Sequence, residues 1–161
     1  MADGRRDVEM KIVARIEVEA LFKSTYGPSY QNRENQIEAI LELVNGRGRV
    51  LLVQRTGWGK SAVYFVATRL LRLQGKGPTI IVSPLLVLMR DQIESAERLG
   101  VRAVTLNSSN QEDWENVVRE IANGKVDALL ISPERFNNED FRKNVLIKNN
   151  ILANAGMIVV D

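Results

Sequence analysis

The sequence predicts an α/β protein built on an open, mainly parallel β-sheet with helices on both faces. Short, β-branched apolar runs recur along the chain, and segments with helical periodicity lie between them. The runs are nearly continuous in hydrophobicity, which is typical of strands buried on both faces. Such strands, alternating with helix-length crossovers, form parallel sheets. With 161 residues, of which 45% are hydrophobic, the chain can bury the core of one domain.

Two helices are expected before the first strand. The first is indicated by apolar residues spaced four apart in the N-terminal segment. These residues are Val8, Ile12, Ile16 and Ala20. The second helix follows a turn at Tyr26–Ser29 and carries an apolar stripe of its own. This stripe is formed by Ile37, Ile40, Leu41 and Val44. We therefore divide the chain into an N-terminal helix within residues 1–25 and a main domain over residues 26–161.

Five apolar runs are expected to form the strands of the sheet. They are Arg49–Val53, Thr79–Ser83, Arg102–Leu106, Asp127–Ile131 and Gly156–Val160. Three helices are expected between them, because apolar residues recur there at helical spacing and a glycine follows each segment. These helices span Val63–Leu71, Leu85–Leu99 and Trp114–Ala122. The last strand is of the buried type, yet only Asp161 follows it, so we expect a domain that is incomplete at its C-terminus.

The composition excludes several kinds of chemistry. The chain contains no cysteine and no histidine, which excludes disulfides, thiol nucleophiles, Ser-His catalysis and most zinc sites. Lys and Arg number 22 against 20 Asp and Glu, so the net charge of +2 does not by itself indicate a nucleic-acid partner. The N-terminus lacks the apolar region of a signal peptide, and no apolar run approaches the roughly 20 residues that span a bilayer. We expect a soluble cytoplasmic protein without a membrane partner.

The segment Thr56–Ser61, with the sequence TGWGKS, lies between an expected strand and an expected helix. A phosphate-binding P-loop requires this context, because its glycines let backbone N–H groups turn toward an anion at the helix N-terminus. Lys60 is expected to reach the β- and γ-phosphates of ATP, and the Ser61 hydroxyl to bind Mg²⁺. Gln54 replaces the first glycine of the usual pattern, so only the shorter T-G-x-G-K-S form holds. The alternative is a glycine-rich turn with an exposed lysine.

Asp161 ends the apolar run that begins at Met157. An aspartate at the carboxyl end of a strand beside the P-loop strand holds Mg²⁺ in proteins of this kind. We therefore expect Lys60 and Asp161 to be catalytic residues, and Ser61 and Asp161 to be the metal ligands. An ordinary polar residue at a strand end explains Asp161 equally well. No residue after Asp161 supplies a catalytic base, so we expect this chain alone to bind nucleotide without hydrolysing it well.

Four further segments stand in a fixed order after the TGWGKS segment. They are Ser83–Gln92 (SPLLVLMRDQ), Leu106–Ser109 (LNSS), Leu130–Arg135 (LISPER) and Val159–Asp161 (VVD). In this order the chain resembles the first RecA-like domain of RecQ-family DNA helicases, in helicase superfamily two, from Tyr26 to Asp161. The last segment is similar to the start of a D-E-A-H box. The resemblance implies a RecA-like P-loop NTPase fold, and this family also lacks the glycine that Gln54 replaces.

The resemblance also implies an adenine site. Arg33–Gln36 (RENQ) is similar to the R-x-x-Q segment whose Gln contacts the adenine edge and whose Arg supports the pocket. The implied ATP-binding residues are Arg33, Gln36, Thr56, Gly57, Trp58, Gly59, Lys60 and Ser61. Asn35 stands where the family has glycine, and Asn32 stands where it has an aromatic residue. We therefore expect Tyr26 or Tyr30 to supply the ring that stacks on adenine.

By the same resemblance, residues that follow three of the strands are expected to contact DNA. They are Ser83, Pro84, Leu85, Asn107, Ser108, Ser132 and Arg135. These segments are also typical of turns and helix caps, and both roles hold together because a helix N-terminus offers N–H groups to a phosphate. Of the two tryptophans, Trp114 is expected in the core. Trp58 is expected to be exposed, or to pack on nucleotide or on a neighbouring domain.

The function that the resemblance implies is the ATP-binding portion of an ATP-dependent DNA helicase. ATP and Mg²⁺ would bind at residues 56–61, and single-stranded or partly duplex DNA would cross the carboxyl edge of the sheet. In the full-length protein a second RecA-like domain would close on ATP and drive 3′ to 5′ movement and unwinding. Two alternatives stay open, namely a nucleotide- or DNA-binding half-domain without activity of its own, and a P-loop NTPase that is not a helicase.

Overall fold

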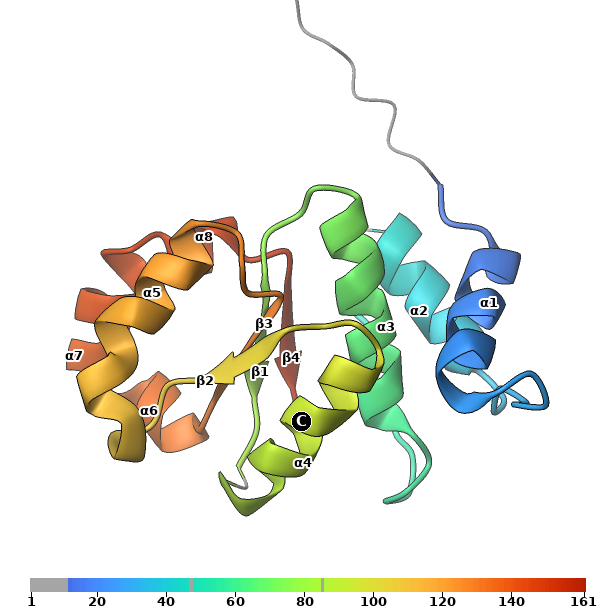
Figure 1. The fold of residues 1–161 in the computed structure, drawn as a ribbon, viewed down its shortest axis with the longest axis horizontal. Coiled ribbons are helices and arrows are strands. Elements are labelled where there is room, and N and C mark those ends of the chain that lie inside the picture. The colour runs from blue at the N-terminus through green and yellow to red at the C-terminus, as the bar shows by residue number, and fades with distance from the viewer. Residues whose placement is uncertain (1–11, 47, 85) are drawn as a thin grey trace, which may run out of the picture.

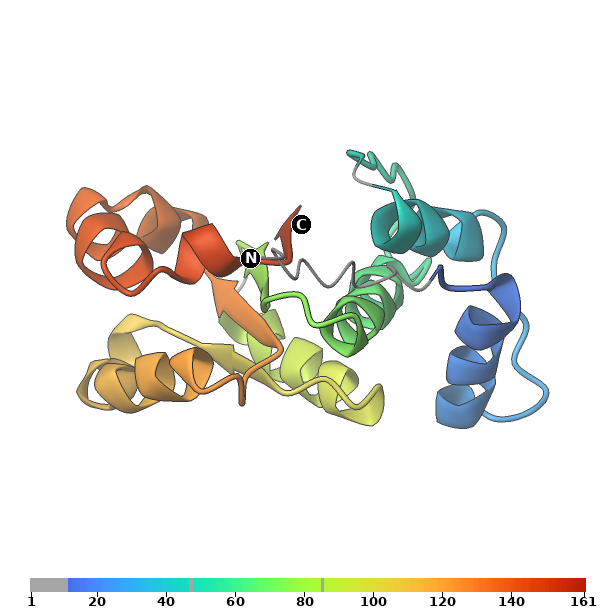
Figure 2. The same cartoon turned by 90° about the horizontal axis from the view of Figure 1, so that it is seen from above.

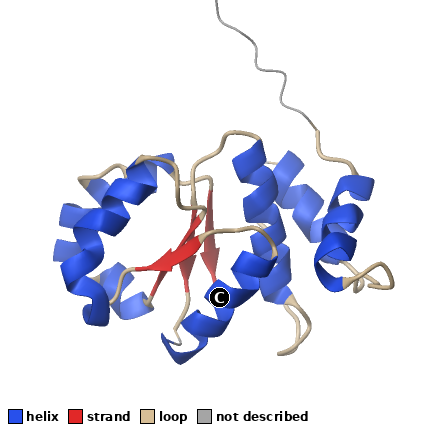
Figure 3. Ribbon diagram, viewed as in Figure 1, coloured by secondary structure: helices blue, strands red, loops and turns tan. Residues whose placement is uncertain are grey.

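The structure is a computed structural model that describes residues 12–46, 48–84 and 86–161 (Figure 1, Figure 3). The helices before the first strand are α1 (Arg15–Tyr26), α2 (Gln36–Asn45) and α3 (Lys60–Leu73). The strands are β1 (Thr79–Val82), β2 (Ala103–Thr105), β3 (Ala128–Ile131) and β4 (Met157–Val160). The helices between the strands are α4 (Leu86–Arg98), the 3₁₀-helix η1 (Ser108–Asp113), α5 (Trp114–Ala122), α6 (Pro133–Asn137), α7 (Glu139–Phe141), the π-helix η2 (Arg142–Ile147) and α8 (Ile151–Asn154). Within the described part of the chain, no helix is long and apolar enough to cross a membrane.

The four strands form one sheet in the order β2-β3-β1-β4, and every pair in it is parallel. In the register of the sheet, Thr79 lies beside Ala128 of β3 and beside Met157 of β4. The expected open parallel sheet is therefore confirmed. The strands also follow the expected runs, with ends that differ by one residue.

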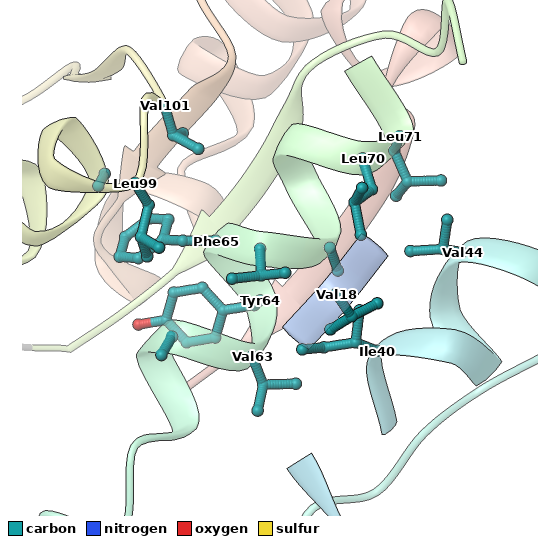
Figure 4. Packing of buried hydrophobic residues seen from close by; sticks show 14 of the residues in the cluster. Val18, Ile40, Val44, Val63, Tyr64, Phe65, Leu70, Leu71, Leu99 and Val101 are labelled. Carbon is teal, nitrogen blue, oxygen red and sulfur yellow. The ribbon is translucent and has the colours of Figure 1, made fainter. Parts of the chain in front are cut away.

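Each face of the sheet buries its own hydrophobic core. Ile81 of β1 and Leu130 of β3 are paired in register and belong to a first core, which they share with side chains of α1–α4 (Figure 4). The neighbouring pair, Ile80 and Leu129, belongs to a second core shared with side chains of α5, α7, η2 and α8. Figure 1 and Figure 2 show α1–α3 and α5–α8 on opposite sides of the strands. The prediction of helices on both faces is confirmed.

The expected strand Arg49–Val53 is not formed. Val50 and Leu52 pack against the first core, whereas Leu51 and Val53 are 88% and 79% exposed. The segment therefore alternates in burial as a strand does, yet it joins no ladder. A cavity of about 660 Å³, lined by Val50 on one side and by residues of β4 on the other, lies between this segment and the sheet. In the described part of the chain the sheet therefore ends at β4.

The N-terminal helix also differs from the prediction. Helix α1 begins at Arg15, and its buried residues are Val18 and Phe22 rather than Ile16, which is exposed. The expected position Val8 lies outside the described residues. The helix is oriented by its contact with α2, where the Asn45 side-chain amide exchanges two 2.8 Å hydrogen bonds with the backbone of Val13. With this contact in place, α1 turns Val18 and Phe22 toward the first core. These residues lie two positions after Ile16 and Ala20 of the predicted stripe. The boundary at residue 25 remains a prediction.

Candidate nucleotide-binding site

The carboxyl ends of all four strands meet at one edge of the sheet, because the strands are parallel. Two backbone hydrogen bonds extend the ladders past these ends. The Ser83 N–H donates to the Ile131 carbonyl at 3.0 Å, and the Asp161 N–H donates to the Val82 carbonyl at 2.9 Å. The residues that follow β1 and β4 therefore lie side by side. In open α/β sheets, ligands bind in the crevice outside this edge.

The phosphate loop, Thr56–Ser61, turns into α3 at Lys60. Gly57 and Gly59 both adopt left-handed backbone conformations, with φ of 79° and 100°, as the predicted loop requires. Gly59 has a second constraint, since a Cβ atom built on it would lie 2.7 Å from Nε2 of Gln36. The loop thus depends on a residue without a side chain at position 59.

The Lys60 side chain folds back over the loop. Its Nζ donates hydrogen bonds to the backbone carbonyls of Gln54, at 2.9 Å, and Arg55, at 3.3 Å. The ammonium is thereby held beside the N-terminus of a 14-residue helix, whose first N–H groups have no partner within the helix. A positive charge and a helix N-terminus together favour an anion at this place.

A cavity of about 570 Å³ opens in front of this loop. Its lining residues come from the phosphate loop, the end of β1, helix α4 and the end of β4. They are Thr56, Gly57, Gly59, Lys60, Ser61, Ser83, Pro84, Asp91, Gln92, Ser95 and Asp161. The structure therefore brings Ser61 and Asp161, the two expected metal ligands, to one cavity. Ser83 and Pro84, which were expected on DNA, line the same cavity.

Gln36 and Arg33 connect the segment before α2 to the phosphate loop. The Gln36 side chain is fully buried; its Oε1 accepts from the Arg33 backbone N–H at 2.8 Å, and its Nε2 donates to the Gly59 carbonyl at 3.5 Å. The Arg33 guanidinium donates to the Gly57 carbonyl at 2.7 Å. Tyr30 donates to Gln36 Oε1 at 3.5 Å, and its ring stacks on Tyr26 with centroids 4.9 Å apart. The expected adenine-site residues are thus gathered beside the loop.

Asn35 shapes the backbone between the Arg33 and Gln36 positions. Its φ of 66° is in the left-handed region, at the N-cap of α2. Asparagine tolerates this conformation better than other residues with a side chain. Its side chain makes no capping hydrogen bond, so the backbone conformation is what selects the residue.

We expect Asn35→Ala to lower the free energy of unfolding by about 1 kcal/mol, because alanine is strained in the left-handed region. Asn35→Gly is expected to be at least as stable as the wild type. Urea unfolding followed by circular dichroism measures both. Asn150, which has a φ of 56° at the N-cap of α8, provides the matched pair of variants away from the site. An Asn35→Ala protein as stable as the Asn35→Gly protein contradicts this assignment.

Trp58 is not exposed as expected. It lies within the phosphate loop, but only 7% of its surface is accessible, and it belongs to the first core. The Trp58 N–H donates to the Arg55 carbonyl at 3.2 Å, which closes a turn. Two flanking left-handed glycines allow this turn to direct the indole inward. Trp58 therefore anchors the loop to the core, and its contact with nucleotide remains a prediction.

The other residues expected on DNA lie at or near helix starts, and their contact with DNA remains a prediction. Ser132 caps α6 by accepting from the Arg135 N–H at 3.2 Å. The Arg135 guanidinium lies over the rings of Trp114 and Phe141, 5.0 Å and 5.6 Å from their centroids. The Asn107 carbonyl accepts from Trp114 Nε1 at 3.0 Å. Ser108 begins η1, and Leu85 lies outside the described residues.

Sequence reasoning missed two residues at the site, Tyr64 and Gln92. The Tyr64 hydroxyl donates to Asp161 Oδ2 at 3.2 Å, and Gln92 Nε2 donates to the same oxygen at 3.2 Å. Burial, followed by the charge of Asp161, raises the pKa of Tyr64, so its hydroxyl stays protonated. No local signal in the sequence marks either residue, because the two residues and Asp161 belong to three separate elements.

The parallel sheet, the glycine loop at its carboxyl edge and the Lys-Ser start of α3 define a P-loop domain of the RecA-like type. The family model described as DEAD/DEAH box helicase matches residues 33–161, and the chain belongs to this family.

Similar proteins support the same assignment. The chain is 34% identical over 133 residues to the ATP-dependent DNA helicase RecQ of Haemophilus influenzae, which covers 81% of this chain and 20% of that protein. It is 35% identical over 111 residues to the RecQ protein of Bacillus subtilis, covering 68% of the chain and 18% of the relative. It is 30% identical over 130 residues to the ATP-dependent helicase SGS1 of Saccharomyces cerevisiae. This match covers 80% of the chain and 9% of the relative. The resemblance to the RecQ family is confirmed, and the chain spans about a fifth or less of these relatives.

Proposed function

We propose that this chain is the ATP-binding portion of an ATP-dependent DNA helicase. The observation that carries the proposal is the cavity that joins the glycine loop, Lys60, Ser61 and Asp161 at the carboxyl edge of the sheet. The positive helix terminus and the ammonium suit a triphosphate. The relatives described as ATP-dependent DNA helicases support ATP as the nucleotide. Strand translocation in the 3′ to 5′ direction, and a second RecA-like domain, belong to this proposal for the longer protein.

The donor groups around the cavity fit a magnesium ion that arrives with the nucleotide. Mg²⁺ prefers oxygen ligands, and it is usually bound by one or two carboxylates together with substrate phosphates. The Ser61 hydroxyl and the Asp161 carboxylate are such ligands. When bound, the ion supplies neutralisation of charge on the phosphate oxygens. The phosphates of ATP would supply the remaining oxygen ligands.

Adenine recognition is assigned to Gln36, with Arg33 supporting it. An amide can donate to one edge atom of adenine and accept from the neighbouring amino group. In the structure this amide is hydrogen-bonded to Arg33 and Gly59. Adenine would exchange these bonds for its own, so base binding and the shape of the phosphate loop are connected through one side chain.

DNA is assigned to the same edge, over the residues that follow β1, β2 and β3. Backbone N–H groups at the starts of the helices there can bind phosphates. Arg135 can add a charge, because stacking engages the faces of its guanidinium, whereas its N–H donors lie in the plane. This contact predicts binding that is insensitive to base sequence and sensitive to salt.

The DNA assignment is tested by the anisotropy of a labelled single-stranded oligonucleotide at several salt concentrations. Affinity is expected to fall as salt rises, and Arg135→Gln is expected to reduce the log–log slope by about 0.7, the value for one phosphate on a single strand. Arg119→Gln removes the same charge near the C-terminus of α5, whose connection leads to the opposite edge of the sheet, and is expected to leave the slope unchanged. Equal slopes for wild type and Arg135→Gln contradict the contact, and binding that is independent of salt contradicts the assignment of DNA to this edge.

A further inference from the structure

Three side chains from three separate elements form a closed set of hydrogen bonds beside the phosphate loop. Tyr64 belongs to α3, Gln92 to α4, and Asp161 follows β4. Besides the two bonds to Asp161 Oδ2, Gln92 Nε2 donates to the Tyr64 hydroxyl at 3.3 Å. Figure 4 shows the Tyr64 ring within the first core, with its hydroxyl oxygen pointing away from Ile40 and Val44. The ring is therefore anchored in apolar packing while the hydroxyl reaches the end of the sheet.

Both donors act on the same carboxylate oxygen. Hydrogen bonds to an ionised carboxylate are stronger than those between neutral groups, and two of them fix the rotation of a short side chain at a strand end. Because Tyr64 and Gln92 both contact Oδ2, Oδ1 is left free of these two donors. A carboxylate held in this way presents one oxygen in a constant direction.

We propose that Tyr64 and Gln92 are positioning residues that hold the Asp161 carboxylate for the magnesium ion of bound ATP. The inference rests on the proposed function, in which Asp161 is a ligand of that ion. Neither residue needs to touch the nucleotide. Each acts through Asp161, as partners behind a metal ligand do when they set its orientation.

The orientation of the Gln92 amide supports this positioning role. Its Oε1 is buried without a hydrogen-bond partner among the described residues, while its Nε2 faces the carboxylate. Reversing the amide would place Oε1 against a carboxylate oxygen, so charge selects the observed orientation. Gln92 therefore presents its donor group, and not its acceptor, to the Asp161 carboxylate.

The test measures affinity for Mn²⁺, used as a paramagnetic substitute for Mg²⁺, in the presence of an ATP analogue that cannot be cleaved. Electron paramagnetic resonance gives the free ion during the titration. Tyr64→Phe and Gln92→Ala are each expected to weaken Mn²⁺ binding by about tenfold. Binding of the analogue without metal is expected to stay at the wild-type value in both variants, which separates positioning from general damage to the fold. Glu94→Ala, an exposed change on the same helix, is the matched control and is expected to match the wild type.

Asp161→Asn tests the assignment of Asp161 as a metal ligand separately from the positioning role of Tyr64 and Gln92. If this variant binds Mn²⁺ as the wild type does, Asp161 is not a ligand, and the metal assignment is overturned together with the inference. If Asp161→Asn loses Mn²⁺ while Tyr64→Phe and Gln92→Ala both retain the wild-type affinity, the metal site stands and the positioning inference is wrong. Urea unfolding of each variant verifies the fold, and Gln92→Ala keeps the test decisive if Tyr64→Phe proves unstable.

Discussion

Replacing Lys60 by alanine is expected to weaken binding of ATP with Mg²⁺ by about tenfold to a hundredfold, the range that corresponds to losing a hydrogen bond to a charged group. Among the described residues that line the cavity, Lys60 supplies the one positive side chain, and Asp91 and Asp161 supply two carboxylates. Without the ammonium, none of the described lining residues would offer a positive side chain to the triphosphate. The expected effect is therefore the loss of one charge–charge attraction.

Fluorescence titration with a labelled ATP analogue measures this loss. Lys125→Ala removes the same charge from an exposed position before β3 and is expected to bind the analogue as the wild type does. Because the hydrogen bonds of the Lys60 ammonium go to the backbone carbonyls of Gln54 and Arg55, its removal is expected to change the free energy of unfolding little. Unchanged affinity in Lys60→Ala, with the fold intact, would refute the assignment of the loop to phosphate.

Replacing Gly59 by alanine is expected to damage both the fold and the site. The left-handed backbone alone costs about 1–2 kcal/mol with any ordinary side chain. In addition, the new methyl group would press on the Gln36 amide, which is fully buried and bonded to Arg33 and to Gly59 itself. Since Gln36 cannot move without breaking those bonds, a further loss of about 1 kcal/mol is expected.

Gly57→Ala separates the two causes. Gly57 has a similar left-handed φ of 79°, but a Cβ atom there would meet nothing within 4 Å. Its substitution is expected to lower the free energy of unfolding only by the cost of the left-handed backbone. Urea unfolding should therefore show that Gly59→Ala is less stable than Gly57→Ala. Shortening Gln36 to alanine should remove most of the difference, which a double-mutant cycle reveals as coupling. Equal stability of the two glycine variants would show that the Gln36 contact carries no energy.

The sheet could be predicted from the sequence wherever both faces of a strand are covered. β1 and β3 are buried along their whole length, and their apolar runs are continuous. Residues 49–53 have the same composition, but whether they pair depends on how closely another backbone approaches, and local hydrophobicity does not encode that distance. The stripe of α1 was misplaced for a related reason. Its contact with α2, including the bonds of Asn45, decides which face turns inward.

The site could be predicted where chemistry is concentrated in one segment. The glycines, Lys60 and Ser61 carry their function in their spacing, and parallel strands place Asp161 beside them. Tyr64 and Gln92 could not be found in this way, because their role arises only when α3, α4 and the end of β4 converge. Trp58 was misjudged because its position in a glycine loop suggested exposure, whereas the loop geometry directs it into the core.

The outer side of β4 has a consequence for how the chain behaves in solution. In the described structure this strand ends the sheet, and Ile158 and Val160 on it are exposed. An uncovered strand offers a row of backbone donors and acceptors to any extended peptide. A strand from another molecule that paired with β4 would form backbone hydrogen bonds and bury apolar side chains. At high concentration or on heating, the chain is therefore expected to aggregate first through the exposed edge of β4.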